Sequence, residues 1–309
     1  MSPDKPKRIG LIIGRENDWP NAFMEAVNQH PDVVAELVKI GGTFIEDGCP
    51  YDLIIDRMSH EVPYYRIYVE YAALHGAYVI NNPFTWSVDN KFFGTSLTHS
   101  LGLKSPRTVV LPNKELDTDT VPDSFRNLLY PMDWQGIIDH VGVPAIFKEV
   151  RSGGRRLAFR VHSVEELIQQ YDESGTRTMI LQELIKSDEH IHCFVVGQKK
   201  VLPLQFSFGE NKYYENSIEE NPLYDQFIQK ALMLSQAYAY DINMVEFVVK
   251  DGVLYVINST NPSPLINRKL MTPSQFEWIV RETVAFALEC LERPSPQRIP
   301  FDLKPSPST

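Results

Sequence analysis

The chain has 309 residues, of which 43% are hydrophobic, and its formal net charge is −10. That length is enough for about two domains with buried cores. No run of Lys and Arg accompanies the acidic excess, so no nucleic acid partner is expected, because affinity for phosphate backbones comes from clustered basic residues.

Membrane and disulfide-rich classes are also disfavoured. Residues 1–8 are polar and lack the apolar core of a signal peptide, and no apolar stretch approaches the roughly 18 residues of a membrane span. The cysteines Cys49, Cys193 and Cys290 lie far apart and match no zinc or redox spacing. We therefore expect a cytoplasmic protein with no membrane partner.

The first 83 residues alternate strand and helix signals. Four short apolar runs predict strands, at residues 8–14, 33–40, 51–56 and 77–81. Two intervening segments predict helices, at residues 20–30 and 63–76. This alternation predicts a small parallel α/β domain.

Residues 84–292 instead predict an α+β region, in which helices are mixed with strand pairs and hairpins. Helices are expected at 88–101, 130–141, from the capping box at 163–166 onward, at 223–238 and at 272–292. Strands are expected at 108–111, 145–148, 157–161, 178–183, 191–196, 200–206, 244–250 and 253–258. The Pro-rich tail, residues 293–309, is expected to be extended or disordered.

Several common site motifs are missing from the sequence. No G-x-G-x-x-G follows the first strand, and there is neither a P-loop motif nor a G-x-S-x-G hydrolase elbow. His190 and His192 share one face of a strand, but two imidazoles without a third ligand are weak support for zinc. The alternative is that they line a nucleotide cleft.

Two lysines are candidates for binding phosphate. Lys91 is near the start of a predicted helix, and Lys148 ends an apolar strand. A charge at the end of a buried strand needs a partner or water, and a bound phosphate is such a partner. For Lys148 alone, a surface position or a pair with Glu149 is an equally good explanation.

A glycine-containing loop follows Lys148. Ser152, Gly153 and Gly154 can offer backbone N–H groups to phosphate oxygens, because glycine lets the backbone approach closely. Its basic flanks add positive charge, from Arg151, Arg155 and Arg156. The alternative is an ordinary turn between two strands.

A carboxylate at the end of a later strand is a candidate for binding adenine. Glu183 ends the run 179–183, so its side chain could accept the adenine amino group while the next backbone groups pair with the ring edge. An ordinary strand-end carboxylate in solvent is the alternative.

The hairpin at residues 244–258 carries a candidate magnesium site. Glu246 lies within an apolar strand, where a carboxylate needs a cation or several donors. A three-residue loop at 250–252 would place Asn258 on the face of Glu246, with Asn261 just beyond, and magnesium prefers such oxygen ligands. A two-residue loop would send Asn258 to the opposite face.

Taken in order, these features resemble the ATP-grasp superfamily, in particular its RimK-like carboxylate–amine ligases. The matching pieces are Asn82-Pro83 with Asp89-Asn90-Lys91, Phe147-Lys148 with Gly153-Gly154, Gln182-Glu183-Leu184-Ile185, residues 190–196, and Glu246 with Asn258-Ser259-Thr260-Asn261-Pro262. The resemblance implies a pre-ATP-grasp α/β domain at 1–83 and a two-subdomain ATP-grasp domain at 84–292. Within the latter, a lid is expected at 145–183 and a C-terminal subdomain at 184–292.

The resemblance also implies roles for individual residues. The expected ATP-binding set is Lys91, Lys148, Ser152, Gly153, Gly154, Gln182, Glu183, Leu184 and Ile185, with Asp188 or Glu189 near the ribose. Arg156 and His192 would supply catalytic charge, His192 standing where many relatives carry Arg and being charged only when protonated. One or two magnesium ions would be held by Glu246, Asn258 and Asn261.

The implied reaction is ATP-dependent carboxylate–amine ligation through an acylphosphate. The substrates would be a small amino acid, peptide or metabolite, and the chain would form a homodimer or homotetramer. Arg268 and Lys269 could meet an acidic substrate, with solvated charges as the alternative. Since Asn258 replaces an expected metal carboxylate, an ATP-binding protein with weak or lost catalysis is the second hypothesis, and an ATP-grasp phosphotransferase is the third.

Overall fold

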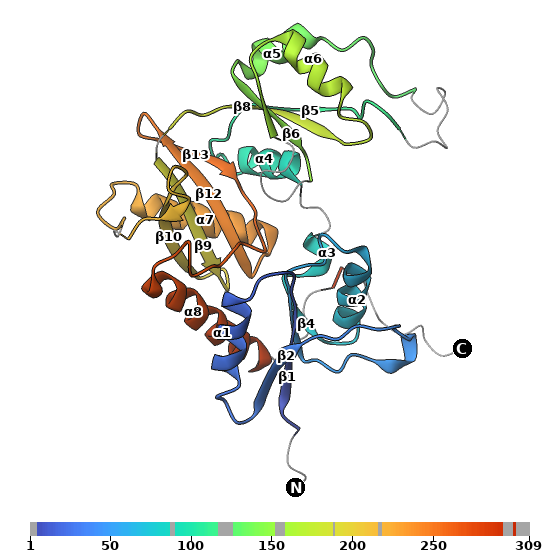
Figure 1. Cartoon of the computed structure of the whole chain (residues 1–309), viewed down its shortest axis with the longest axis vertical. Helices are drawn as coiled ribbons and strands as arrows, with labels where there is room; N and C mark the ends of the chain where they lie inside the picture. Colours follow the sequence, from blue (N-terminus) through green and yellow to red (C-terminus); the bar gives the residue numbers. More distant parts are fainter. Residues whose placement is uncertain are drawn as a thin grey trace. The chain divides into compact units, whose positions relative to one another are not determined.

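The computed structural model describes residues 5–86, 90–116, 126–151, 158–187, 189–215, 218–292 and 299–300 (Figure 1). The chain divides into two compact units. Unit 1 comprises residues 1–88, 191–245 and 260–309, and unit 2 comprises residues 89–190 and 246–259. Apart from residues 299–300, the predicted tail lies outside the described residues.

Unit 1 contains a parallel four-stranded sheet with the order β2-β1-β3-β4. Its strands are β1 (Lys7–Ile12), β2 (Val33–Leu37), β3 (Leu53–Asp56) and β4 (Tyr78–Ile80). They alternate with α1 (Asp18–Val27), the short helix η1 (Ile45–Asp47), α2 (Pro63–Leu74) and α3 (Pro83–Trp86). The predicted parallel α/β arrangement is confirmed.

Both faces of this sheet are covered, because successive side chains of a strand point to opposite sides. Leu53 and Ile55 of β3 belong to the core that α1 and the long helix α8 (Pro273–Glu292) cover, through Phe23 and Phe276. Ile54, between them, faces a second core on the side of α2. The helices of both layers lie on opposite sides of the sheet in Figure 1.

A five-stranded sheet has the order β11-β10-β9-β12-β13. Its strands are β9 (Glu189–Val196), β10 (Lys200–Ser207), β11 (Lys212–Tyr213), β12 (Ile242–Lys250) and β13 (Val253–Asn258), and α7 is Tyr224–Tyr238. In unit 1, the side chain of Asn81 ties the end of β4 to the start of β12. Its Nδ2 donates to the Ile242 carbonyl at 2.7 Å, and its Oδ1 accepts from the Ile242 N–H at 2.8 Å.

Unit 2 contains an antiparallel four-stranded sheet with the order β5-β8-β6-β7. Its strands are β5 (Thr108–Leu111), β6 (Ala145–Glu149), β7 (Ala158–Val161) and β8 (Met179–Glu183). Its helices are α4 (Lys91–Ser100), α5 (Trp134–Val141) and α6 (Val164–Asp172). Side chains of α5 and α6, such as Ile138 and Leu167, share one core with Phe147 and Leu181 of the sheet.

The antiparallel sheet of unit 2 begins before the residues expected for the lid, whose bounds stay a prediction. A lid beginning at residue 145 would exclude β5, yet Val109 of β5 pairs with Leu181 of β8, so the sheet that contains β6 and β7 begins at Thr108. Local sequence patterns do not predict that β5 pairs with β8, because tertiary packing decides which distant strands pair.

Two predicted helix starts are corrected, and capping gives the reason. The helix expected from residue 88 begins at Lys91, since the Asn90 Oδ1 accepts from the Phe93 N–H at 2.9 Å. The helix expected from residue 130 begins at Trp134, since the Asp133 Oδ1 accepts from the Gly136 N–H at 2.9 Å. Among the described residues, no helix is both long and apolar enough to span a bilayer.

Candidate functional site

The hairpin of β12 and β13 has a different turn from the one predicted. Lys250 pairs with Val253, so the loop is the two residues Asp251 and Gly252, with φ values of 52° and 72°. Positive φ at both positions is the geometry of a type I′ turn, which Asp-Gly favours. The predicted three-residue loop is wrong.

Asn258 nevertheless lies directly opposite Glu246. The register shifts between Glu246 and Phe247: Phe247 pairs with Val256, and Glu246 pairs with Asn258. Ile257 is therefore an extra residue, a β-bulge, which reverses the alternation of faces that the shorter turn would have caused. The Asn258 Nδ2 donates to the Glu246 Oε1 at 3.1 Å.

Lys148 is held in place by the sheet of unit 2. Ile146 of β6 pairs with Gln182 of β8, and Lys148 lies on the same face one step further along β6. The Lys148 Nζ donates to the Gln182 Oε1 at 2.8 Å, while the Gln182 Nε2 donates to the Thr108 Oγ1 at 3.0 Å. The buried amide of Gln182 thus orients the ammonium.

Lys91 lies close to Lys148 because the start of α4 is tied to the end of β6. The Lys91 N–H donates to the carbonyl of Val150 at 3.0 Å, two residues beyond Lys148. Lys91 is also the first residue of a helix, where backbone N–H groups and the helix dipole favour an anion.

The electrostatics of Lys148 report this convergence. The pKa of Lys148 is lowered from its ordinary 10.5 to about 8, chiefly by burial and also by the charge of Lys91, while the charge of Glu246 partly offsets both effects. Two ammonium groups and one carboxylate therefore act on one another within unit 2. Such a cluster, with a net positive charge, is suited to binding a polyphosphate group.

The lowered pKa predicts a pH-dependent stability. The unfolded chain, with Lys148 near 10.5, holds more protons than the folded chain, with about 8, across the window between these values. The free energy of unfolding should therefore rise with pH through this window, by up to ~3 kcal/mol, and Lys148 should contribute no slope below it. Urea unfolding of the wild type and of Lys148→Met at several pH values checks this as a difference. Parallel curves would contradict it.

Glu183 is engaged by an arginine. The Arg107 Nε donates to the Glu183 Oε2 at 3.1 Å, and Arg107 Nη2 donates to the Oε1 at 3.2 Å. Partial burial would raise the pKa of Glu183, but the hydrogen bonds and charge of Arg107 outweigh it and lower the pKa. A carboxylate has further lone pairs beyond those that face Arg107, so the contact of Glu183 with adenine stays a prediction.

Several predicted site residues lie outside the described part of the chain or next to it. Those outside are Ser152, Gly153, Gly154, Arg156 and Asp188. Glu189 is described; its N–H donates to the Ser187 Oγ at 3.0 Å, and the same hydroxyl donates to the Val249 carbonyl. This joins the segment after Ile185 to β12 within unit 2.

Three other predicted site residues belong to unit 1. His192 is buried, with its Nδ1 3.0 Å from the Tyr213 hydroxyl and its ring stacked on Phe206. The Arg268 guanidinium lies 4.0 Å from the centroid of the Phe276 ring. The Asn261 backbone is fixed on both sides: its N–H donates to the Asn243 Oδ1 at 2.9 Å, and its carbonyl accepts from the Met244 N–H at 3.0 Å.

The donor set fits magnesium only in the presence of phosphates. Within the described ranges, no three His, Cys, Asp or Glu side chains gather in a way that could hold a metal ion. Magnesium, however, is commonly bound by one or two carboxylates together with substrate phosphates and water. Glu246 with Asn258, near the two lysines that are predicted to bind phosphate, fits that pattern.

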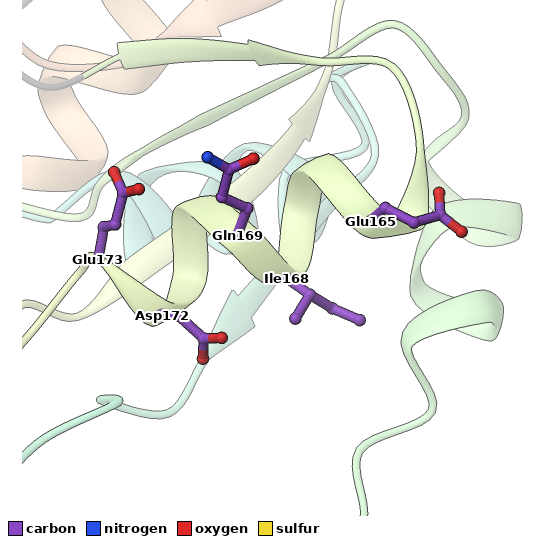
Figure 2. A pocket seen from close by; sticks show the side chains of 5 residues that line it. All are labelled: Glu165, Ile168, Gln169, Asp172 and Glu173. Carbon is purple, nitrogen blue, oxygen red and sulfur yellow. The ribbon is translucent and has the colours of Figure 1, made fainter.

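A surface pocket on α6 does not fit a nucleotide. It is lined by Glu165, Ile168, Gln169, Asp172 and Glu173, and Figure 2 shows these side chains pointing in different directions from one helix. Its carboxylates would repel a triphosphate. We assign it no role in ATP binding.

Sequence reasoning missed Arg107 and Thr108. They act on Glu183 and Gln182 through the pairing of β5 with β8, over 76 and 74 residues of sequence. An Arg just before a predicted strand is the only local signal, and it carries no information about the partner strand.

No protein-family model matches the chain. Among curated proteins, it is 26% identical over 106 residues to the D-alanine–D-alanine ligase of Polynucleobacter asymbioticus. That match spans about a third of each chain: 31% of this one and 32% of the relative.

Solved structures match over most of the chain. The RimK domain ATP-grasp protein of Sphaerobacter thermophilus is 14% identical, covers 91% of this chain and 99% of its own, and has a TM-score of 0.65. The D-alanine–D-alanine ligase of Bacillus anthracis, complexed with ATP, is 17% identical, covers 92% and 97%, and has a TM-score of 0.64. The ATP-grasp ligase PsnB, complexed with minimal precursor, Mg and ADP, is 14% identical, covers 93% and 98%, and has a TM-score of 0.59.

Proposed function

We propose that this chain, which has the ATP-grasp fold, binds ATP with magnesium and joins a carboxylate to an amine. The observation that carries the proposal is the convergence of Lys148 and Lys91 with Glu246 in unit 2. Ligands in the similar structures, ATP in one and Mg with ADP in another, support it by analogy.

The residues of unit 2 would divide the work of binding. Lys148, oriented by Gln182, and Lys91, at the start of α4, would hold the phosphates. Backbone groups of Leu184 and Ile185 would pair with the adenine edge. Glu246 and Asn258 would hold magnesium, and the ion would neutralise charge on the transferred phosphoryl group.

The proposed reaction has two steps. A carboxylate oxygen of the acid attacks the γ-phosphorus, giving an acylphosphate and ADP. The amine nitrogen then attacks the acyl carbon, phosphate leaves and the amine proton is released, so that an amide forms. The lysines contribute positioning and charge neutralisation, and no covalent protein nucleophile is required.

The acid and amine are proposed to be small: amino acids, peptides or related metabolites. We place the reaction in the cytoplasm, where ATP is available. The homodimer or homotetramer expected from the resemblance stays a prediction.

A specific contact favours a second candidate function, ATP binding with little turnover. The Asn258 amide donates to Glu246, whereas a carboxylate at this position would add a second negative metal ligand. The site then offers less negative charge to magnesium, which weakens transition-state stabilisation.

ADP release separates the two functions. The chain is incubated with ATP, Mg²⁺ and pairs of amino acids or dipeptides, and ADP is measured by a coupled assay. A ligase is expected to release ADP in an amount equal to the amide formed, and only when both acid and amine are present. Tight ATP binding without ADP release for any pair would overturn the ligase proposal and favour the second function.

A further inference from the structure

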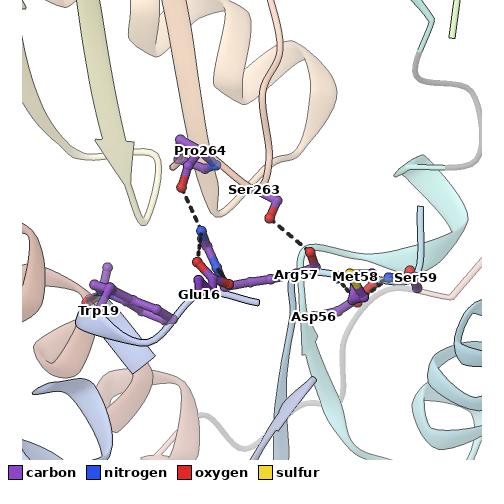
Figure 3. A network of polar contacts seen from close by, with 9 residues as sticks. Glu16, Trp19, Asp56, Arg57, Met58, Ser59, Ser263 and Pro264 are labelled. Carbon is purple, nitrogen blue, oxygen red and sulfur yellow. Dashed lines mark hydrogen bonds and ion pairs between the residues drawn. The ribbon is translucent and has the colours of Figure 1, made fainter. Parts of the chain in front are cut away.

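Each unit contains a buried polar network that joins segments distant in the sequence. In unit 1, the side chain of Arg57 is 2% exposed, and its Nη2 donates to the Glu16 Oε2 at 2.8 Å and to the carbonyl of Pro264 at 2.6 Å (Figure 3). These contacts tie together three segments of unit 1, which gives Arg57 a structural role there. The network in unit 2 instead includes Lys148, a candidate phosphate-binding residue.

Three neighbouring strands of unit 2 place the side chains of this second network in one row. Gln182 of β8 pairs with Thr108 of β5 on one side and with Ile146 of β6 on the other. Residues that pair directly lie on the same face of a sheet, and Lys148, two residues beyond Ile146, lies on that face as well. The Thr108 hydroxyl, the Gln182 amide and the Lys148 ammonium therefore follow one another across the sheet.

The hydrogen bonds of this row all run in one direction. The Lys148 Nζ donates to the Gln182 Oε1 at 2.8 Å, and the Gln182 Nε2 donates to the Thr108 Oγ1 at 3.0 Å. The Thr108 hydroxyl in turn donates to the carbonyl of Pro106 at 2.9 Å. We refer to these four residues, Lys148, Gln182, Thr108 and Pro106, as the Gln182 network.

The two ends of the Gln182 network fix the orientation of the amide between them. A backbone carbonyl only accepts, so the single proton of the Thr108 hydroxyl goes to Pro106, and a lone pair of its oxygen is left for Gln182. An ammonium only donates, so Lys148 requires the amide oxygen. With the amide turned over, its N–H groups would face Lys148, and its oxygen would face a hydroxyl whose proton is already donated. Gln182 therefore has one favourable orientation.

Burial makes this orientation unfavourable to lose. Gln182 is 5% exposed, and Pro106 is buried. A buried donor that loses its acceptor is not readily compensated by water. A side chain at position 108 without a hydroxyl would remove the acceptor of the Gln182 Nε2. The amide would then turn or shift, and the acceptor of Lys148 would move with it.

We propose that Thr108 is a positioning residue, which orients Gln182 so that Lys148 directs its ammonium at the phosphates of ATP. The inference rests on the proposed function, because it takes Lys148 as a phosphate-binding residue. Thr108 acts through Gln182 rather than by contact with the nucleotide. Lys91 repels the Lys148 ammonium and Glu246 attracts it, so an oriented acceptor helps to define where the ammonium lies.

Thr108→Val tests the proposal in the full chain. Valine has nearly the shape of threonine and favours strands, but it has no hydroxyl. ATP affinity, measured by calorimetric titration in Mg²⁺, should fall about fivefold to tenfold, the effect of one lost hydrogen bond. Thr108→Ser keeps the hydroxyl and should bind ATP within about twofold of the wild type. Recovery by serine separates the hydrogen bond from the packing of the side chain.

A second measurement needs no nucleotide. In protein labelled with ¹⁵N-glutamine, NMR follows the exchange of the Gln182 side-chain N–H protons with solvent, and Gln182→Leu identifies their signals. Exchange should be slow in the wild type and in Thr108→Ser, and about tenfold faster in Thr108→Val. Thr178→Val is the matched control. The Thr178 hydroxyl donates to the Asn113 Oδ1 at 2.7 Å, outside the Gln182 network, so its loss should change neither measurement.

Each of four results would overturn the proposal. If folded Thr108→Val binds ATP within about twofold of the wild type, Thr108 does not position Lys148. If Thr108→Ser loses as much affinity as Thr108→Val, the shape of the side chain acts and the hydroxyl does not. If Gln182 exchange is unchanged in Thr108→Val, Thr108 does not orient the amide. If the wild type binds no ATP, the proposed function fails, and the positioning role fails with it even where Gln182 exchange reports the network.

Discussion

Lys148→Met is expected to lose ATP binding while making the folded chain more stable. Truncating one partner of a close charge pair costs about 2–5 kcal/mol, so ATP affinity should fall by at least ~30-fold. The variant also removes a half-buried ammonium whose pKa is about 8 instead of 10.5, a cost of ~3 kcal/mol. Loss of the hydrogen bond between Lys148 and Gln182 costs about 1 kcal/mol, which offsets part of the stabilisation.

Calorimetric titration with ATP and urea unfolding near neutral pH measure the two effects. The expected net stabilisation is about 1–2 kcal/mol, in the direction of the common trade-off between stability and function. Lys104→Met, an exposed lysine of the same unit, is the control and should alter stability by less than about 0.5 kcal/mol. ATP affinity of Lys148→Met within threefold of the wild type would refute a phosphate-binding role.

Asn258→Asp is expected to make the chain depend strongly on magnesium. It replaces the amide donor 3.1 Å from Glu246 by a second carboxylate, so the metal-free protein should lose about 1–2 kcal/mol of stability through repulsion. With Mg²⁺ and ATP present, the added charge should lower the Mg²⁺ concentration for half-maximal ATP binding by about tenfold. If the wild type releases ADP only slowly, Asn258→Asp should release ADP faster, because it binds Mg²⁺ more tightly.

Thermal unfolding with and without Mg²⁺–ATP, together with ADP release, measures this change. Asn258→Ala is the matched control, because it removes the hydrogen bond to Glu246 without adding charge. It should not lower the Mg²⁺ concentration for half-maximal ATP binding. A rise in turnover from zero would favour the second function for the natural chain. If Asn258→Asp needs the same Mg²⁺ concentration as the wild type, Asn258 is not a magnesium ligand.

The sequence was most informative where structure is local. Apolar runs that alternate with capped helices identify the parallel sheet of unit 1, since period and capping depend on neighbouring residues. Lys148 stood out because a charge at the end of an apolar strand needs an explanation. Helix starts at Lys91 and Trp134 were missed by a few residues, although Asn90 and Asp133 are recognisable caps.

Long-range pairing was not accessible in the same way. The face on which Asn258 lies depends on the length of the turn and on the β-bulge at Ile257. The two-residue turn alone would place Asn258 on the other face from Glu246, and the bulge returns it to the same face. No local sequence pattern reveals the bulge. Arg107 reaches Glu183, and Arg57 reaches Pro264, over 76 and 207 residues. Such contacts follow from tertiary packing, so they could not be inferred from spacing.

The central claim is that the cluster of Lys91, Lys148 and Glu246 binds ATP. Isothermal titration of the full chain with ATP, in Mg²⁺ and then in EDTA, tests this claim most directly. The expected result is one ATP per chain with a Kd of about 1 μM to 1 mM in Mg²⁺, and weaker binding in EDTA. No binding of ATP at about 5 mM in either condition would contradict the claim.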